Sequence, residues 1–244
     1  MRISRLYTDQ PLAPETELVL DERRGHYLQR VLRLRPGDTL VLFNGDGNDY
    51  AVEFLGGPKA APRVRVNARL PAVPESPLQL VLAQAVGKGD RMDQVLQKAT
   101  ELGVAGVQPL FTERTEVRLS GSRLARRMDH WRAVTIAACE QSGRARLPDL
   151  HPPLDLDSWL ATPGDALRLA LVPGAERPLT AVAPVPEMAL LIGPEGGLSE
   201  REVAALTLSG CVPVAFGPRI LRTETAGPAA VAVLQAMAGD CTAA

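Results

Sequence analysis

Two segments of the chain combine glycine, proline and charged side chains in a spacing that suits a ligand site. The first is GPEGG at 193–197, and the second is FGPRILRTETA at 216–226; each follows an apolar run. Glycine leaves the backbone accessible and its N–H groups free to act as donors, so a ligand approaches the chain closely there. Arg222 and Glu224 add two groups that could stabilise an anion or accept a proton. Glu224 is equally well explained as an acid favoured in the first turn of a helix.

Familiar nucleotide-binding motifs do not fit these or other glycine segments. A phosphate-binding P-loop requires GxxxxGK[ST], but Leu82 stands where the first glycine is needed and Gly89 follows Lys88. The segment GDGNDY at 45–50 begins as a dinucleotide fingerprint but lacks its third glycine and resembles a hairpin turn. GPEGG alone is consistent with a tight turn before a helix, and the second glycine-proline loop makes that explanation weaker.

The elements that must position these loops alternate along the last two thirds of the chain. Apolar runs predict strands at 78–86, 104–110, 167–172, 187–193 and 211–216. Helical periodicity predicts helices at 91–103, 123–143, 199–209 and 225–238. This order indicates an α/β fold with a mostly parallel sheet covered by helices. Ligands bind outside the carboxyl ends of such strands, where both glycine-proline loops are expected. Pro213 favours an edge or irregular strand at 211–216.

The N-terminal part has a different pattern. Three prolines within LPAVPESPL at 70–78 mark a break, so we expect a mainly β domain at 1–70, a linker at 71–77 and the α/β domain at 78–244. A hairpin is expected around the GDGN turn, followed by a strand at 63–70. A helix is expected at 22–34, with Tyr27, Leu28, Val31 and Leu32 on its inward face.

Composition and charge narrow the class of protein. The chain has 244 residues, 45% hydrophobic and 23% charged, which is typical of globular domains. It lacks an apolar stretch long enough to span a bilayer and an apolar leader, which predicts a cytoplasmic protein. The three cysteines and three histidines are scattered, so we expect no metal site. Residues 1–150 carry 22 basic and 18 acidic side chains, whereas residues 151–244 carry 5 and 10. The basic part is therefore the better partner for a polyanion.

Several longer motifs run along the chain: HYLQRVLRLRPGD at 26–38, KGDRMDQVLQKATELGV at 88–104, ERTEVRL at 113–119, AACEQSGR at 137–144, LIGPEGGLSEREV at 191–203 and FGPRILRTETA at 216–226. Together they resemble the RsmE family of 16S rRNA uridine N3-methyltransferases, which belongs to the SPOUT superfamily. The resemblance covers nearly the whole chain, and its two C-terminal motifs are the most specific.

The resemblance implies a SPOUT-type knotted, mostly parallel sheet with helices on both faces, plus a small PUA-like β-barrel domain that grips RNA. It further implies a C-terminal trefoil knot that binds S-adenosyl-L-methionine, a homodimer, and methylation of N3 of a uridine in 16S rRNA, within the small ribosomal subunit. By the same analogy the cofactor bed comprises Leu171, Val172, Pro173, Gly174, Ile192, Gly193, Pro194, Glu195, Gly196, Gly197, Phe216, Gly217, Pro218, Arg219, Ile220, Leu221, Arg222 and Thr223.

Residue roles follow from the resemblance and the chemistry of the reaction. Uracil N3 is a poor nucleophile while protonated, so a group must take its proton or stabilise the anion; the candidates are Arg222, Glu224 and Arg114. Arg222 stays charged and suits the second role. The expected RNA-binding residues are Arg5, Arg23, Arg24, Arg30, Arg33, Arg35, Lys88, Arg91 and Arg114.

The sequence departs from the family pattern after RTETA, where Gly227 and Pro228 follow. Because proline lacks an N–H, we expect the last helix to begin near Thr225 with Pro228 in its first turn. Two other functions stay open: a ribose 2′-O RNA methyltransferase of the same superfamily, and a non-catalytic RNA-binding assembly factor. The sequence does not identify the target nucleotide, or whether naked rRNA or an assembled subunit is the substrate.

Overall fold

The computed structural model describes residues 4–241 and contains two compact units. Unit 1 holds the chain up to Pro74 together with Cys139–Leu147, and unit 2 holds Glu75–Ala138 and the chain from Pro148 onward. The boundary at Pro74 falls inside the proline-rich segment at 70–78. Sequence patterns did not indicate that the short segment Cys139–Leu147 belongs with the N-terminal part.

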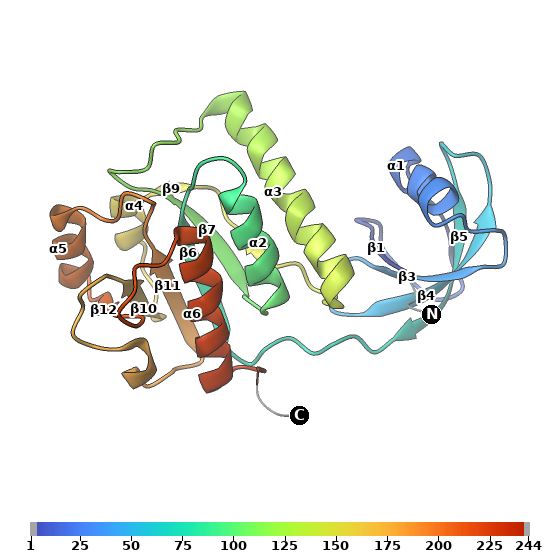
Figure 1. Cartoon of the computed structure of the whole chain (residues 1–244). Helices are drawn as coiled ribbons and strands as arrows, with labels where there is room; N and C mark the ends of the chain where they lie inside the picture. The colour runs from blue at the N-terminus through green and yellow to red at the C-terminus, as the bar shows by residue number, and fades with distance from the viewer. Residues whose placement is uncertain (1–3, 242–244) are drawn as a thin grey trace. The chain divides into compact units, whose positions relative to one another are not determined.

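Unit 1 is built on one five-stranded sheet in the order β1-β3-β4-β5-β2 (Figure 1). Strands β1 and β3 pair in parallel, whereas β3 and β4 pair antiparallel. The β3–β4 pair is the hairpin expected around the GDGN turn. Alternate residues of β4 and β5 are buried, among them Val52, Phe54 and Val64, so one face of the sheet packs on the core. The strands are β1 (Arg5–Tyr7), β2 (Glu17–Val19), β3 (Thr39–Phe43), β4 (Asp49–Gly56) and β5 (Arg63–Leu70).

The helix expected at 22–34 is shorter and irregular. It consists of α1 (Glu22–His26) and a π-helical turn, η1 (Tyr27–Val31), in which the N–H of Leu32 donates to the carbonyl of Tyr27 at 3.0 Å. The wider turn changes which side chains face inward. Leu28 is buried, but Tyr27 is 39% and Val31 58% exposed, so the prediction that these two pack inward was wrong.

Unit 2 contains a seven-stranded sheet with the order β12-β10-β11-β6-β7-β8, and β9 also pairs with β7. All of its recorded strand pairs are parallel, which confirms the predicted sheet. The short strand β12, which contains Pro213, lies at the edge as predicted. The strands are β6 (Gln79–Ala85), β7 (Gly106–Phe111), β8 (Asp149–Leu150), β9 (Leu154–Asp155), β10 (Leu167–Leu171), β11 (Glu187–Ile192) and β12 (Val212–Val214).

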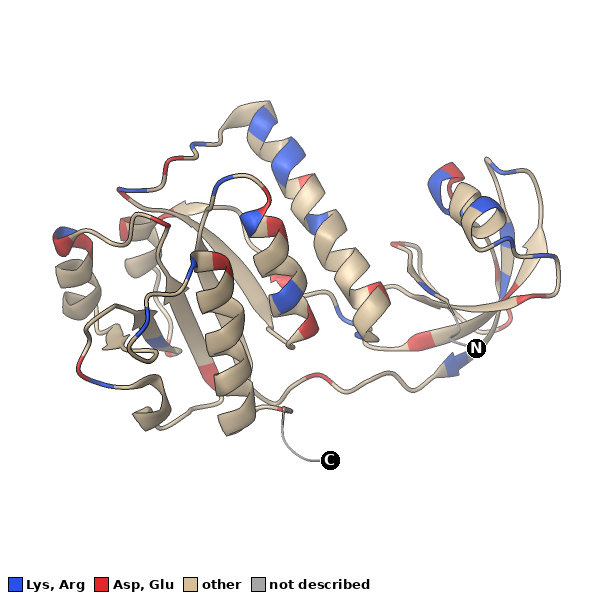
Figure 2. Cartoon of the chain, viewed as in Figure 1, with Lys and Arg blue, Asp and Glu red and all other residues tan. Residues whose placement is uncertain are grey.

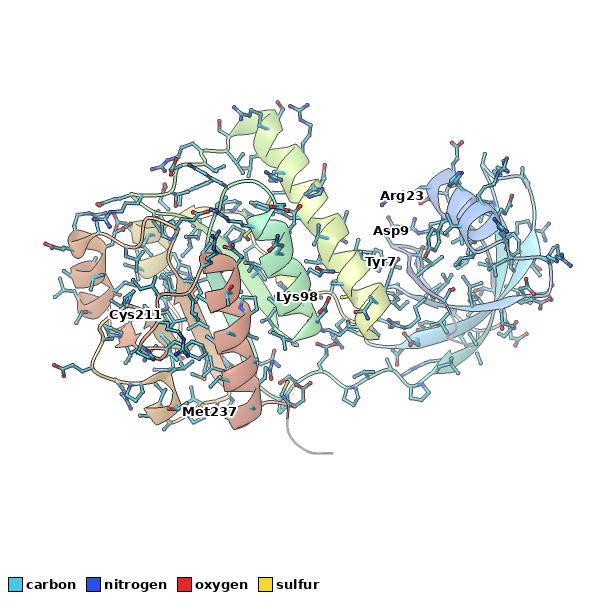
Figure 3. The ribbon with its side chains drawn as sticks, viewed as in Figure 1. Tyr7, Asp9, Arg23, Lys98, Cys211 and Met237 are labelled. Atoms are coloured by element: carbon cyan, nitrogen blue, oxygen red, sulfur yellow. The ribbon has the colours of Figure 1, made fainter. Side chains whose placement is uncertain are left out.

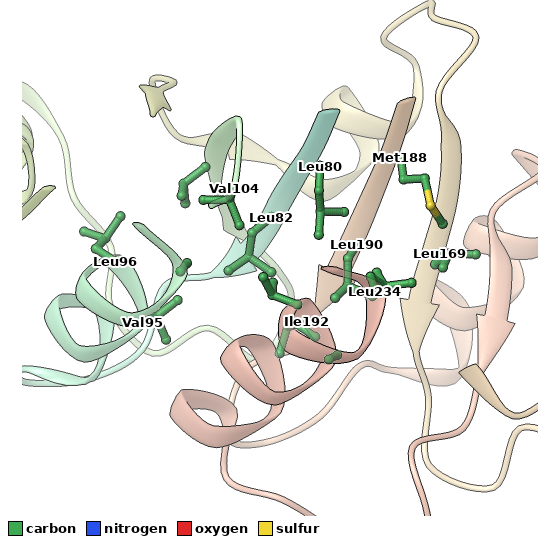
Figure 4. Packing of buried hydrophobic residues seen from close by; sticks show 14 of the residues in the cluster. Leu80, Leu82, Val95, Leu96, Val104, Leu169, Met188, Leu190, Ile192 and Leu234 are labelled. Carbon is green, nitrogen blue, oxygen red and sulfur yellow. The ribbon is translucent and has the colours of Figure 1, made fainter. Parts of the chain in front are cut away.

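Helices cover both faces of this sheet, as the alternation of buried side chains along β11 shows. Leu190 packs with residues of α2 (Arg91–Glu101), α3 (Gly121–Ser142) and α6 (Thr223–Ala238) (Figure 4). Its neighbour Leu191 packs with α4 (Leu156–Leu160) and α5 (Glu200–Leu208). A 3-10 turn, η2 (Leu179–Ala181), joins the first of these clusters. Both clusters consist mainly of buried aliphatic side chains, with Trp131 in the first and Trp159 in the second, so each face of the sheet is closely packed against its helices.

The predicted start is correct for one of the two helices that follow the glycine-proline loops and wrong for the other. Helix α5 begins with the predicted capping box, in which the Ser199 and Glu202 side chains bond each other's backbone N–H. Helix α6 begins at Thr223, two residues earlier than expected. Pro228 therefore lies inside the helix rather than in its first turn, and it has no N–H to donate to the carbonyl of Glu224. Between residues 4 and 241, no helix is both long and apolar enough to cross a membrane.

Candidate functional site

A cavity of about 1080 Å³ lies where β10, β11 and β12 end. Its walls are the three segments that follow these strands, together with one side of α5 and the first turn of α6. The glycine-proline segments 193–197 and 216–222 therefore meet in one site, as the sequence predicts. Every residue of the predicted cofactor bed lines the cavity except Gly196, whose Cα lies against the Arg114 side chain.

The glycines of these loops are required by the backbone and by close packing. Gly197 and Gly217 have φ values of +70° and +72°, a region that other residues rarely adopt. A Cβ at Gly193 would lie 3.2 Å from Cγ of Leu198, and one at Gly196 would lie 3.2 Å from Cβ of Arg114. The loops consequently present bare main chain, and few side chains fill the space they enclose.

A buried hydrogen-bonded chain fixes two of the loops to the sheet. The Thr223 hydroxyl donates to the carbonyl of Gly193 at 2.9 Å, and it accepts a hydrogen bond from Nε2 of Gln84 at 2.8 Å. The same Nε2 donates to the carbonyl of Ala85 at 3.1 Å. Gln84 and Thr223 are 1% and 5% exposed, so these bonds are shielded from water. The chain joins the end of β6, the loop after β11 and the start of α6.

Gln84 was not among the predicted site residues. The sequence gives one indication of its role: Gln84 is an amide within the apolar strand LQLVLAQA, whose other residues are mostly buried. A buried amide normally has a hydrogen-bond partner. An amide in a strand that ends at the glycine-rich loops therefore indicates a hydrogen bond to one of those loops.

Two carboxylates flank Arg91 at the mouth of the cavity. Arg91 forms an ion pair with Oε1 of Glu195, and its Nε lies 3.8 Å from Oε2 of Glu224. Burial raises the pKa of Glu195, but hydrogen bonds from its own N–H, from Arg91 and from the N–H of Lys88 outweigh burial and leave the pKa lowered. The Glu195 hydrogen bond raises the pKa of Arg91. Oε2 of Glu224 is buried and accepts no hydrogen bond from the described residues.

The three predicted catalytic residues occupy different positions. Arg222 is the N-cap residue of α6, and its exposed side chain lines the cavity beside Glu224. Arg114 does not line the cavity; its Nη1 donates to the carbonyl of Gly196 at 2.9 Å from behind the glycine turn. The structure thus brings Arg222 and Glu224 together and places Arg114 where it supports the backbone of the loop.

Sequence reasoning missed the apolar wall that α5 contributes. Val203, Ala204 and Thr207 line the cavity at helical spacing, and the helix periodicity at 199–209 contained this signal. The remaining additional lining residues are Arg91, Ala175, Leu198, Glu200, Ala215, Glu224 and Ala226. A cavity with apolar walls and main-chain polar groups suits a nucleoside-like ligand better than a polyphosphate. In residues 4–241 no group of three or more His, Cys, Asp or Glu side chains could hold a metal ion.

The predicted RNA-binding residues of unit 1 divide into two groups. Arg30, Arg33 and Arg35 are exposed. Arg23 on α1 is also exposed (Figure 3). Arg5 is half-buried and bonds Asp49 and the carbonyls of Cys139 and Arg144. Arg24 has Nε 2.7 Å from the carbonyl of Tyr7 and pairs with Asp21. In unit 2, Lys88 pairs with Glu116.

Comparison with protein families first defines the class of protein. A family model described as an RNA methyltransferase domain matches residues 74–235, and one described as an RNA methyltransferase PUA domain matches residues 20–61. Among solved structures, a methyltransferase from Legionella pneumophila crystallised with S-adenosylmethionine (SAM) is 39% identical, with a TM-score of 0.93 over 98% of this chain and 100% of that one. The parallel α/β unit, its cavity and the curled N-terminal sheet are those of an RNA methyltransferase with a PUA domain.

More specific relatives define the family. The ribosomal RNA small subunit methyltransferase E of Buchnera aphidicola (subsp. Schizaphis graminum) is 32% identical over 98% of both chains, and that of Mycobacterium bovis is 33% identical over 91% of this chain and 90% of its own. A Neisseria gonorrhoeae protein of the same name, solved with S-adenosyl methionine, is 33% identical, with a TM-score of 0.92 over 99% of this chain and 100% of that one. The chain belongs to the family of ribosomal RNA small subunit methyltransferases E.

Proposed function

We propose that this protein transfers a methyl group from S-adenosyl-L-methionine to N3 of a uridine in 16S ribosomal RNA. The observation that carries the proposal is the convergence of three strand-end segments around one cavity, with Glu224 and Arg222 at its edge. Family membership supports the cofactor and the class of substrate, and the side chains at the edge support the choice of a nitrogen that carries a proton.

The cavity fits the cofactor in size and in the kind of groups it presents. About 1080 Å³ is enough for an adenosyl and a methionyl group, and Gly193, Gly197 and Gly217 line the cavity without side chains. The apolar side of α5 suits a base, and main-chain N–H and carbonyl groups suit its polar edge. The bound cofactor supplies an electrophilic methyl group. The protein therefore needs to position the cofactor and the uracil and to accept the proton of N3.

Glu224 and Arg222 are the residues proposed to act on the uracil. Within residues 4–241, Oε2 of Glu224 accepts no hydrogen bond, and it lies 3.8 Å from Nε of Arg91, whose positive charge holds the carboxylate in place. It is suited to accept the proton of N3. The Arg222 guanidinium stays charged and is suited to stabilise the negative charge that develops on the uracil oxygens. Arg114 is proposed to position the Gly196 turn.

RNA recognition is assigned mainly to the exposed arginines of unit 1, which the domain at 1–70 would present to phosphates. Four exposed arginines are available for such contacts: Arg23, Arg30, Arg33 and Arg35. Arg5 and Arg24 instead form hydrogen bonds within the unit. The target base is proposed to leave its stack, because N3 of a paired uridine is hidden. We further propose that the protein acts as a homodimer in the cytoplasm, on rRNA in the small ribosomal subunit.

The experiment is to incubate the protein with methyl-labelled SAM and small subunits that lack the modification, then digest the rRNA and identify the labelled nucleoside by mass spectrometry. The proposal predicts label in 3-methyluridine. Label in a ribose 2′-O-methyl group would refute the N3 assignment, and an unlabelled digest would refute catalysis.

A matched pair of variants tests the assignment of the proton acceptor. Glu224→Gln should lower kcat by about a hundredfold or more, because loss of a positioned base typically has that effect. Glu200→Gln, which also lines the cavity, should retain activity. Equal losses in the two variants would contradict the role of Glu224.

A further inference from the structure

A second hollow lies on the first half of α3 and has a different character from the cofactor cavity. It measures about 330 Å³ and is lined by Leu119, Arg123, Arg126, Arg127 and His130. Lys and Arg residues cluster along this part of the helix (Figure 2). None of the residues that line it is acidic. The spacing of three, four and seven residues places the four basic side chains on one face of the helix.

Two carboxylates near this face are paired with other side chains, and a third, Asp129, lies three residues after Arg126 on the same helix. His130 Nε2 lies 2.6 Å from Oδ2 of Asp93, and Glu116 pairs with Lys88. Across residues 4–241, Arg123, Arg126 and Arg127 form no ion pair with a carboxylate. Three neighbouring guanidinium groups that pair with no carboxylate repel one another, so this arrangement favours an anionic partner.

Arg127 is held in a defined position rather than extended into solvent. Its Nη2 lies 3.4 Å from the carbonyl of Gly89, and its guanidinium lies over the ring of the buried Trp131, 5.9 Å from the ring centre. One wall of the hollow is therefore anchored to the core of unit 2. The planar donors that remain free are suited to phosphate oxygens.

The loop that contains Gly89 connects this hollow to the cofactor cavity. On one side, the N–H of Lys88 donates to Oε1 of Glu195 at 3.1 Å, within the GPEGG segment. On the other side, the next residue, Gly89, accepts the hydrogen bond from Arg127. An RNA strand that leaves the cavity edge and crosses this loop reaches the arginines of α3.

We infer that the hollow on α3 is a phosphate-binding groove for the RNA strand that flanks the target nucleotide. The inference rests on the proposed function, because it takes RNA as the partner. Arginine contacts to phosphates position a strand without reading its sequence, so the groove would fix the register of the target base at the cavity. These residues were not among those expected to bind RNA.

The test uses the double variant Arg123→Gln/Arg126→Gln in the full chain. The probe is the small ribosomal subunit that lacks the modification, and its affinity is measured by filter binding at several salt concentrations. Each lost phosphate contact lowers the magnitude of the slope of log K against log salt by about 0.7–0.9. For the double variant the magnitude of the slope should therefore fall by about 1.5, and the affinity should fall about tenfold. KM for the rRNA should rise while kcat stays close to that of the unmodified protein.

The matched control is Arg132→Gln, on the same helix but on the opposite face, and it should leave the salt slope unchanged. Calorimetry of SAM binding should give the same affinity for all three proteins, since none of these side chains lines the cofactor cavity, and circular dichroism should show that all three are folded. A double variant that keeps the original slope and affinity overturns the groove, as does an equal loss in the control. If the original protein methylates no rRNA, the proposed function fails instead.

Discussion

Replacing Thr223 by valine tests whether the buried hydrogen-bonded chain holds the cofactor loops in place. Valine keeps the shape of the side chain but removes the hydroxyl. The carbonyl of Gly193 then loses its 2.9 Å donor, and Nε2 of Gln84 loses its 2.8 Å acceptor. The loop after β11 would no longer be fastened to α6, so we expect weaker binding of SAM as well as lower stability.

The magnitude follows from the two bonds and their burial. Each lost hydrogen bond contributes about 1 kcal/mol, and the part-buried groups left unpaired add to the loss, which gives about 2–3 kcal/mol. For a chain of this size that corresponds to a fall in Tm of about 5–10 °C. Because Gln84 acts through Thr223, the double variant with Gln84→Met should show a coupling free energy of about 1 kcal/mol.

The assay is urea unfolding followed by circular dichroism, with calorimetry of SAM binding on the same proteins. The control is Thr162→Val, because the Thr162 hydroxyl donates to the Ser158 carbonyl at 3.2 Å on an exposed helix end away from the cavity. The control should lose less than about 1 kcal/mol and keep its affinity for SAM. If Thr223→Val is as stable as the control and binds SAM equally well, the chain does not fasten the loops.

Three further predictions concern single groups. Gly217→Ala should destabilise the protein by about 1–2 kcal/mol and weaken SAM binding, because the φ of Gly217 is +72°. The control Gly164→Ala, which is also in open space but has no positive φ, should change little when both variants are compared by urea unfolding and calorimetry. The lowered pKa of Glu195 means that its stabilising contribution is present above its ordinary value of 4.5 and is lost as pH falls through the lowered value, so Arg91→Gln should flatten the acid side of a stability profile measured from pH 3 to 7. Burial raises the pKa of Cys211 to about 12, so at pH 8 a thiol reagent should label exposed Cys241 rapidly and Cys211 only on unfolding; equal rates in peptide mapping would contradict the buried position.

The sequence was most informative where local chemistry and tertiary structure agree. Apolar runs separated by helical stripes predicted the parallel sheet, Pro213 predicted an edge strand, and the glycine-proline loops predicted the rim that forms the cavity. In each case one physical constraint, such as the missing N–H of proline or the absent side chain of glycine, decides the local structure.

Other features depend on contacts that no local pattern encodes. The π-helical turn at Tyr27–Val31 rotates two apolar side chains outward, although their spacing fits a buried helical stripe. Pro228 lies inside α6 because the helix begins at Thr223, and the Thr223 hydroxyl accepts a hydrogen bond from Gln84 on a distant strand. The knotted path and the homodimer implied by the family resemblance stay predictions.

Filling the cavity with a large side chain tests most directly whether it is the SAM site. Ala204 lies on the side of α5 that lines the cavity, whereas Leu208 on the same helix is 89% exposed and lies outside the lining. Calorimetry should show one SAM bound per chain to the unmodified protein and to Leu208→Trp, and no binding to Ala204→Trp, with all three equally folded. Undiminished binding by Ala204→Trp would contradict the assignment of this cavity.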